Sequence, residues 1–98
     1  MIGTNNQNKE QFQEDIDVLE EVEKQCKLIV WNDEVNSFEW VIKTLIVVCG
    51  HSPEQAEQCA MIIHSSGKYP VKEGSYEELK PMREAIVDRG IDATIECG

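Results

Sequence analysis

The sequence lacks the features that mark membrane-spanning, exported and nucleic-acid-binding proteins. No apolar run approaches the roughly 20 residues that a helix needs to cross a bilayer. The first fifteen residues, MIGTNNQNKEQFQED, are too polar and acidic for a secretory signal or a transit peptide. Basic residues are few, because 9 Lys and Arg stand against 19 Asp and Glu, for a net charge of -10. We therefore expect a cytoplasmic protein that binds neither nucleic acid nor anionic membrane.

The sequence also lacks the close cysteine pairs that are typical of metal sites and redox motifs. The four cysteines at positions 26, 49, 59 and 97 include no C-x-x-C pair. Without a secretory signal, a disulfide framework is not expected. Cys49 and His51 lie close together in the sequence, but the further close ligand pairs of a zinc site are missing. We therefore predict buried, unreactive thiols, no metal or cofactor, and an exposed loop position for His51.

What the chain does contain suffices for one compact domain. Its 98 residues, 41% of them hydrophobic, allow a hydrophobic core that is stable without disulfides or bound metal. Residues 1–24 are dominated by Asn, Gln, Glu and Asp and carry a net charge of -5, half that of the chain. We expect these residues to be a flexible acidic N-terminal extension. Residues 25–98 then form the core domain.

Hydrophobic periodicity and capping signals within the core domain predict six elements in the order β-α-α-β-α-β. The fold class is therefore α+β, with a three-stranded antiparallel sheet and three helices packed on one face. Pro81 either kinks the third helix or marks its first turn. The predicted strands span 26–31, 68–72 and 91–96, and the predicted helices span 37–49, 53–66 and 76 to 88 or 89.

The stretch LIVWNDEVNSFEW, residues 28–40, carries the most specific pattern. A β-branched apolar run changes within one step to Asn32-Asp33-Glu34, and apolar residues return at helical spacing after the capping residue Ser37. An amide and two carboxylates therefore lie between a strand and a helix, with apolar side chains behind them. Polar groups beside an apolar recess form a candidate ligand site. The alternative is that these residues only form a turn and a helix cap.

With a second element, this pattern resembles the ClpS family of bacterial adaptors for N-degron substrates. The first element is the segment VWNDEVNSFEWV, residues 30–41, and the second is an apolar helix that ends His-x-x-Gly, residues 64–67. The resemblance covers about residues 25–96. By itself, the position of His64 favours a residue that stabilises the helix C-terminus.

The resemblance implies an adaptor without catalytic activity. It would bind the free N-terminus of a substrate whose first residue is bulky and hydrophobic, and deliver it to a Clp-family AAA+ unfoldase with its peptidase. Glu34, Phe38 and Ala60 depart from the family pattern of Asp, Met and a larger residue, which would alter the preferred side chain. The implied α-amino ligands are Asn32, Asp33, Glu34 and His64, and the implied hydrophobic pocket residues are Asn36, Phe38, Val41, Ala60 and Ile63.

Two other classes of function compete with this interpretation. In an enzyme, Cys49 or Cys59 would serve as nucleophile, but both lie on apolar helix faces with no base placed by the sequence. A structural interaction domain similar to the C-terminal domain of the ribosomal stalk protein would have a comparable fold. Lysine-rich helices would favour that domain, and residues 53–66 contain no lysine.

Overall fold

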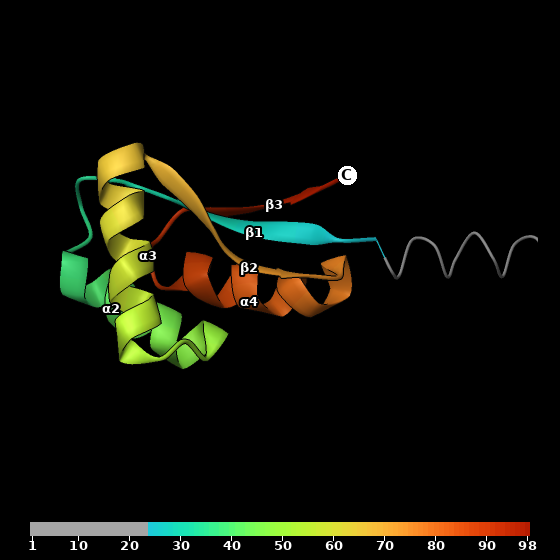
Figure 1. Ribbon diagram of the computed structural model, residues 1–98, viewed down its shortest axis with the longest axis horizontal. Helices are drawn as coiled ribbons and strands as arrows, with labels where there is room; N and C mark the ends of the chain where they lie inside the picture. Colours follow the sequence, from blue (N-terminus) through green and yellow to red (C-terminus); the bar gives the residue numbers. More distant parts are fainter. Residues whose placement is uncertain (1–23) are drawn as a thin grey trace, which may run out of the picture.

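The computed structural model describes residues 24–98, and its element order confirms the predicted β-α-α-β-α-β fold. Three helices pack on one face of a three-stranded antiparallel sheet (Figure 1). The predicted acidic extension, residues 1–24, lies outside the described part except for Lys24. The elements are β1 (Cys26–Trp31), α2 (Phe38–Cys49), α3 (Pro53–Ser66), β2 (Lys68–Gly74), α4 (Tyr76–Asp88) and β3 (Ala93–Cys97).

β1 is the central strand, in the order β2-β1-β3. Its alternating side chains Leu28 and Val30 are 0% and 1% exposed and belong to the main core cluster. Leu45 from α2, Ile63 from α3 and Ile86 from α4 complete the same cluster, so each helix has one face buried against the sheet or its neighbours. This core holds the loop after β1 against the helices.

Serine side chains cap all three helices, which explains where each helix begins. Ser37 accepts a hydrogen bond from the Trp40 backbone N–H, and Ser52 and Ser75 each form a reciprocal capping box. α4 starts directly after Ser75, so Pro81 lies inside the helix rather than in its first turn. At the end of α3, Gly67 has φ +94°, a left-handed conformation that suits glycine and ends the helix beside the β1–α2 loop.

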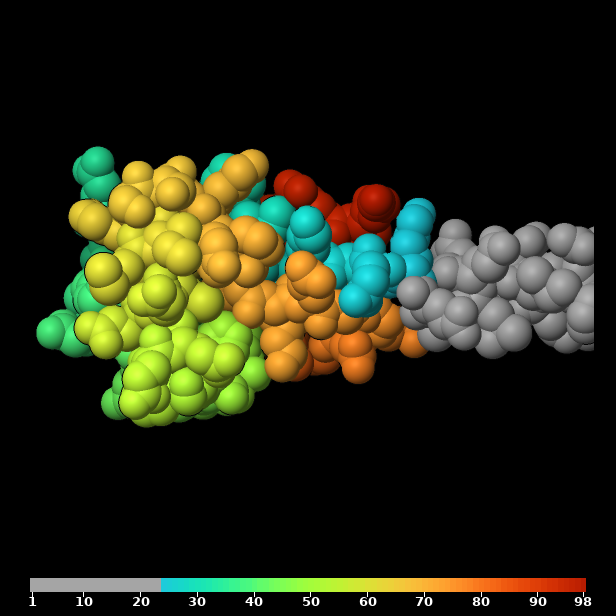
Figure 2. All heavy atoms as spheres, in the orientation of Figure 1, coloured from blue at the N-terminus to red at the C-terminus, as the bar shows by residue number. Residues whose placement is uncertain are grey.

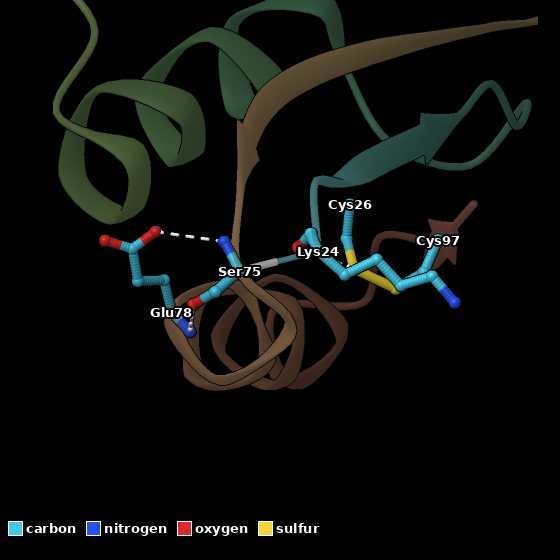
Figure 3. Close-up of a disulfide and its surroundings, with 5 residues drawn as sticks. All are labelled: Lys24, Cys26, Ser75, Glu78 and Cys97. Atoms are coloured by element: carbon cyan, nitrogen blue, oxygen red, sulfur yellow. Dashed lines mark hydrogen bonds between the residues drawn. A yellow bond between two sulfur atoms is a disulfide. The ribbon is translucent and has the colours of Figure 1, made fainter. Parts of the chain in front are cut away.

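The prediction for the cysteines was wrong for two of the four. Cys26 and Cys97 form a disulfide that closes a sequence separation of 71 residues (Figure 3). The two residues are directly opposed in the antiparallel pairing of β1 with β3, so the sheet itself brings the sulfur atoms together. Cys49 and Cys59 are free thiols. The disulfide joins the start of the described fold to its last strand.

His51 lies in the loop between α2 and α3, as predicted, but the prediction that it is exposed was wrong. The ring is half-buried, and its Nε2 lies 2.9 Å from the Val71 carbonyl oxygen. A carbonyl only accepts, so Nε2 carries the proton and donates. His51 thereby links the α2–α3 connection to β2.

No helix within residues 24–98 is long and apolar enough to cross a membrane.

We predict that removal of the disulfide destabilises the domain without changing its fold. Cys97 is exposed, so Cys97→Ser removes little besides the covalent bond, and the free energy of unfolding should fall by about 2–4 kcal/mol. Urea denaturation of the wild type with and without reductant measures the effect. Reduced wild type should match Cys97→Ser, whereas Cys59→Ser, which removes a free thiol, should keep its sensitivity to reductant. An unfolding midpoint that does not respond to reductant would contradict the disulfide.

Candidate functional site

The β1–α2 loop, residues 32–37, lies at the end of the molecule where α3 ends (Figure 1). Figure 2 shows the green atoms that follow β1 at the left edge, beside the yellow atoms of α3. Two backbone hydrogen bonds set the start of the loop. The Trp31 N–H donates to the Asp92 carbonyl at 3.0 Å, and the Asn32 N–H donates to the Gly67 carbonyl at 2.8 Å. Asn32 is thereby held next to the last turn of α3, which carries His64.

The Asp33 carboxylate organises the rest of the loop. Its Oδ1 accepts hydrogen bonds from the backbone N–H groups of Val35 at 2.9 Å and Asn36 at 2.8 Å, and its Oδ2 accepts from the Asn36 side-chain amide at 2.8 Å. The pKa of Asp33 lies below its ordinary value, and the main cause is the hydrogen bond from the Asn36 backbone N–H. Burial acts in the opposite direction. The charged form of Asp33 therefore stabilises a compact loop.

All nine residues predicted for the site line one hollow of about 590 Å³ between the loop, α2 and α3. The structure thus brings together side chains that are up to 32 residues apart in the sequence. The polar members lie on the loop and at the end of α3, and the apolar members lie on the facing sides of α2 and α3. The lining residues are Asn32, Asp33, Glu34, Asn36, Phe38, Val41, Ala60, Ile63 and His64.

The apolar wall has a buried base and an exposed rim. Ala60 and Ile63 on α3 are 3% and 2% exposed, whereas Phe38 at the start of α2 is 40% exposed. Glu34 and His64 are exposed, and neither makes a side-chain hydrogen bond among the described residues. The site therefore offers a free carboxylate and a free imidazole beside an apolar recess, the combination that holds a small ligand group in one orientation.

One contact of the site was not predicted from the sequence. The Asn36 side-chain amide also donates to the carbonyl oxygen of Gly90, at 2.8 Å, although the two residues are 54 positions apart. Gly90 lies in the turn between α4 and β3, and the sequence marked it only as the end of a helix. No local pattern shows that a backbone carbonyl of this turn reaches the loop.

The free thiols take no part in the site. Burial raises the pKa of Cys49 to about 11 and also raises the pKa of Cys59, so both are protonated and unreactive near neutral pH. Neither lines the hollow. Among residues 24–98, no group of three or more His, Cys, Asp or Glu side chains is arranged to hold a metal ion.

Comparison with known families and proteins gives consistent matches. The family model described as "ATP-dependent Clp protease adaptor protein ClpS" matches residues 21–94. The adapter protein ClpS of Corynebacterium diphtheriae is 29% identical over 70 residues, which cover 71% of this chain and 62% of that protein. The ClpS of Corynebacterium efficiens is 29% identical over 68 residues, covering 69% of this chain and 67% of that protein. This chain thus spans about two thirds of the length of these relatives.

A solved structure supports the fold independently. The structure of Agrobacterium tumefaciens ClpS2 bound to L-phenylalaninamide matches 76% of this chain and 98% of its own chain, with a TM-score of 0.73. The sequence identity is 21%, so this likeness concerns the arrangement of helices and strands.

We predict that the Asp33 carboxyl titrates below its ordinary pKa of 3.8. Because folding lowers this pKa, the charged group contributes stability that is present above pH 3.8 and lost as the pH falls through the lowered value. NMR titration of the side-chain carboxyl carbon measures the pKa. The stability advantage of wild type over Asp33→Asn should disappear over the same acidic range. Titration at or above 3.8 would show that the loop hydrogen bonds do not form in solution.

Proposed function

The chain belongs to the ClpS family, and from this premise we propose that it is a cytoplasmic adaptor for a Clp protease rather than an enzyme. In this proposal it binds substrates that begin with a bulky hydrophobic residue and delivers them to a Clp-family AAA+ unfoldase with its peptidase. The observation that carries the proposal is one hollow that combines amide, carboxylate and imidazole groups with an apolar wall. Nothing in binding and delivery requires bond-making by the adaptor.

The polar side of the hollow suits a free α-amino group. Such a group is a cation with three donors, whereas an internal peptide N–H is neutral with one donor. The exposed Glu34 carboxylate supplies a charge-assisted acceptor, and the Asn32 amide oxygen and a ring nitrogen of His64 supply further acceptors. The Asp33 oxygens already accept three hydrogen bonds within the loop. We therefore propose that Asp33 fixes the shape of the loop and attracts the amine through its negative charge, while Glu34 accepts a hydrogen bond from the amine.

The apolar side suits the first side chain of the same substrate. Buried apolar surface gains about 25 cal/mol per Å², so Leu or Phe gains a few kcal/mol that Ala does not. Val41, Ala60 and Ile63 would contact the inserted side chain, and Phe38 would cover it at the rim. The small side chain at Ala60 leaves room in this wall for an aromatic ring. The adaptor would thus select both the chain end and its first residue.

The relatives support the same partners. The Corynebacterium proteins are named as adapters of the ATP-dependent Clp protease, and Agrobacterium ClpS2 binds L-phenylalaninamide, which has a free amine and an aromatic side chain. No observation favours the ribosomal stalk alternative. We further propose that residues 1–24 act as an extension used in delivery and that residues 25–98 form the substrate-binding domain.

We predict that acetylation of the substrate's N-terminus removes most of the affinity. A neutral acetyl-amide cannot satisfy the acceptors around the hollow, and each buried unpaired group costs about 1–3 kcal/mol. A peptide that begins with Phe should therefore bind at least about tenfold more tightly than its acetylated form. Fluorescence anisotropy with labelled peptides measures both. Equal affinity of the two forms would contradict recognition of the amine.

We also predict that Phe38→Ala weakens the binding of peptides that begin with Phe or Leu by about three- to tenfold, because rim contact is lost. Val47→Ala is the matched control, since Val47 lies on the same helix, is 58% exposed and does not line the hollow. Val47→Ala should bind like the wild type. Equal losses in both variants would indicate a general effect on α2 instead of a contact with the substrate.

A further inference from the structure

The side chain of Asn36 connects two segments that are far apart in the sequence. Its Nδ2 donates one hydrogen bond to Asp33 Oδ2 and another to the Gly90 carbonyl, each at 2.8 Å. Both hydrogens of the amide are therefore used, and the side chain bridges the binding loop and the α4–β3 turn. Since Asn36 has no donor hydrogen left on this amide, its donors do not serve a ligand.

The α4–β3 turn is itself held against α2, so it is a firm support for this bridge. The Trp40 indole Nε1–H donates to the Arg89 carbonyl at 3.0 Å, and the Arg89 guanidinium lies 5.0 Å from the centre of the Trp40 ring. Gly90 has φ +87°, which turns its carbonyl to where Asn36 reaches it. Two successive carbonyls of this turn thus accept from the loop and from the first turn of α2.

We propose that Asn36 is a positioning residue of the binding site, which acts through Asp33. By tethering Asp33 to the Gly90 carbonyl, Asn36 holds the loop in the shape that aims Asn32 and Glu34 into the hollow. This inference rests on the proposed function. The loop is then ordered before the substrate arrives, so binding does not have to order it. The α4–β3 turn does not line the hollow, but through Asn36 it contributes to the affinity for the substrate.

The substitution Asn36→Asp tests the bridge, because it keeps the shape of the side chain and replaces the donor amide with a carboxylate. At pH 7 the new carboxylate faces the Asp33 carboxylate and the Gly90 carbonyl with no proton to donate. We expect affinity for a Phe-starting peptide to fall about tenfold. At lower pH, two adjacent carboxyls share a proton, which restores one hydrogen bond. The ratio of variant to wild-type Kd should therefore shrink between pH 7 and pH 5.

The matched control is Ser37→Asp, which adds the same charge one residue further along. Ser37 caps α2 and does not line the hollow, and Asp is an equally good capping residue. This variant should bind within about threefold of the wild type at every pH. Each variant is compared with the wild type at the same pH. Circular dichroism should show both variants folded.

A Kd for Asn36→Asp equal to that of the wild type, or a loss that is the same at pH 7 and pH 5, would overturn the positioning role. If the wild type itself does not bind the free peptide, the proposed function fails, and hydrogen exchange without ligand decides the bridge separately. The Val35 amide, which donates to Asp33, should exchange faster in Asn36→Asp than in Ser37→Asp. Equal exchange in the two variants would overturn the bridge.

Discussion

The carboxylate of Asp33 accepts three hydrogen bonds from residues two and three positions further along the chain. These bonds fold the β1–α2 loop back on itself at the mouth of the hollow. The charged carboxylate suits this role because it accepts several N–H groups at once and makes stronger bonds than a neutral acceptor. Both Asp33 oxygens accept hydrogen bonds inside the loop, whereas the Glu34 side chain makes none among the described residues.

The loop keeps its position because it is held from two sides. On one side, the Asn32 backbone donates to the carbonyl of Gly67 after α3, and on the other, Asn36 donates to the carbonyl of Gly90 after α4. Both acceptors are glycines with positive φ close to a helix end, since Gly67 directly follows α3 and Gly90 is the second residue after α4. The carbonyls of these two glycines lie just past the helices and accept the hydrogen bonds that the loop donates. The two helix ends thus support the site as well as closing their own helices.

Much of this arrangement was predictable from local sequence. The serine caps, the helix-ending glycines and the apolar periodicity predicted all six elements. Such signals are local, since a cap or a periodic face is set within a few residues. The family resemblance placed the loop and α3 side by side, which local patterns alone do not do.

The features that were missed are long-range. The Cys26–Cys97 disulfide depends on the register in which β1 pairs with β3, and a separation of 71 residues gives no hint of that register. The bond from Asn36 to Gly90 depends on where a turn lies in space, and so does the contact of His51 with Val71. Every residue has a backbone carbonyl, so the amino-acid sequence does not show which carbonyl accepts such a hydrogen bond. Only the assembled fold shows them.

The central claim is that one hollow holds both the charged chain end and the first side chain of a substrate. A crystal structure of the protein with a short peptide that begins with Phe tests it most directly. We expect the amine nitrogen within hydrogen-bonding distance of Glu34, Asn32 and His64, with the phenyl ring between Val41, Ala60 and Ile63. A peptide bound elsewhere, or bound here with its N-terminus in solvent, would contradict it.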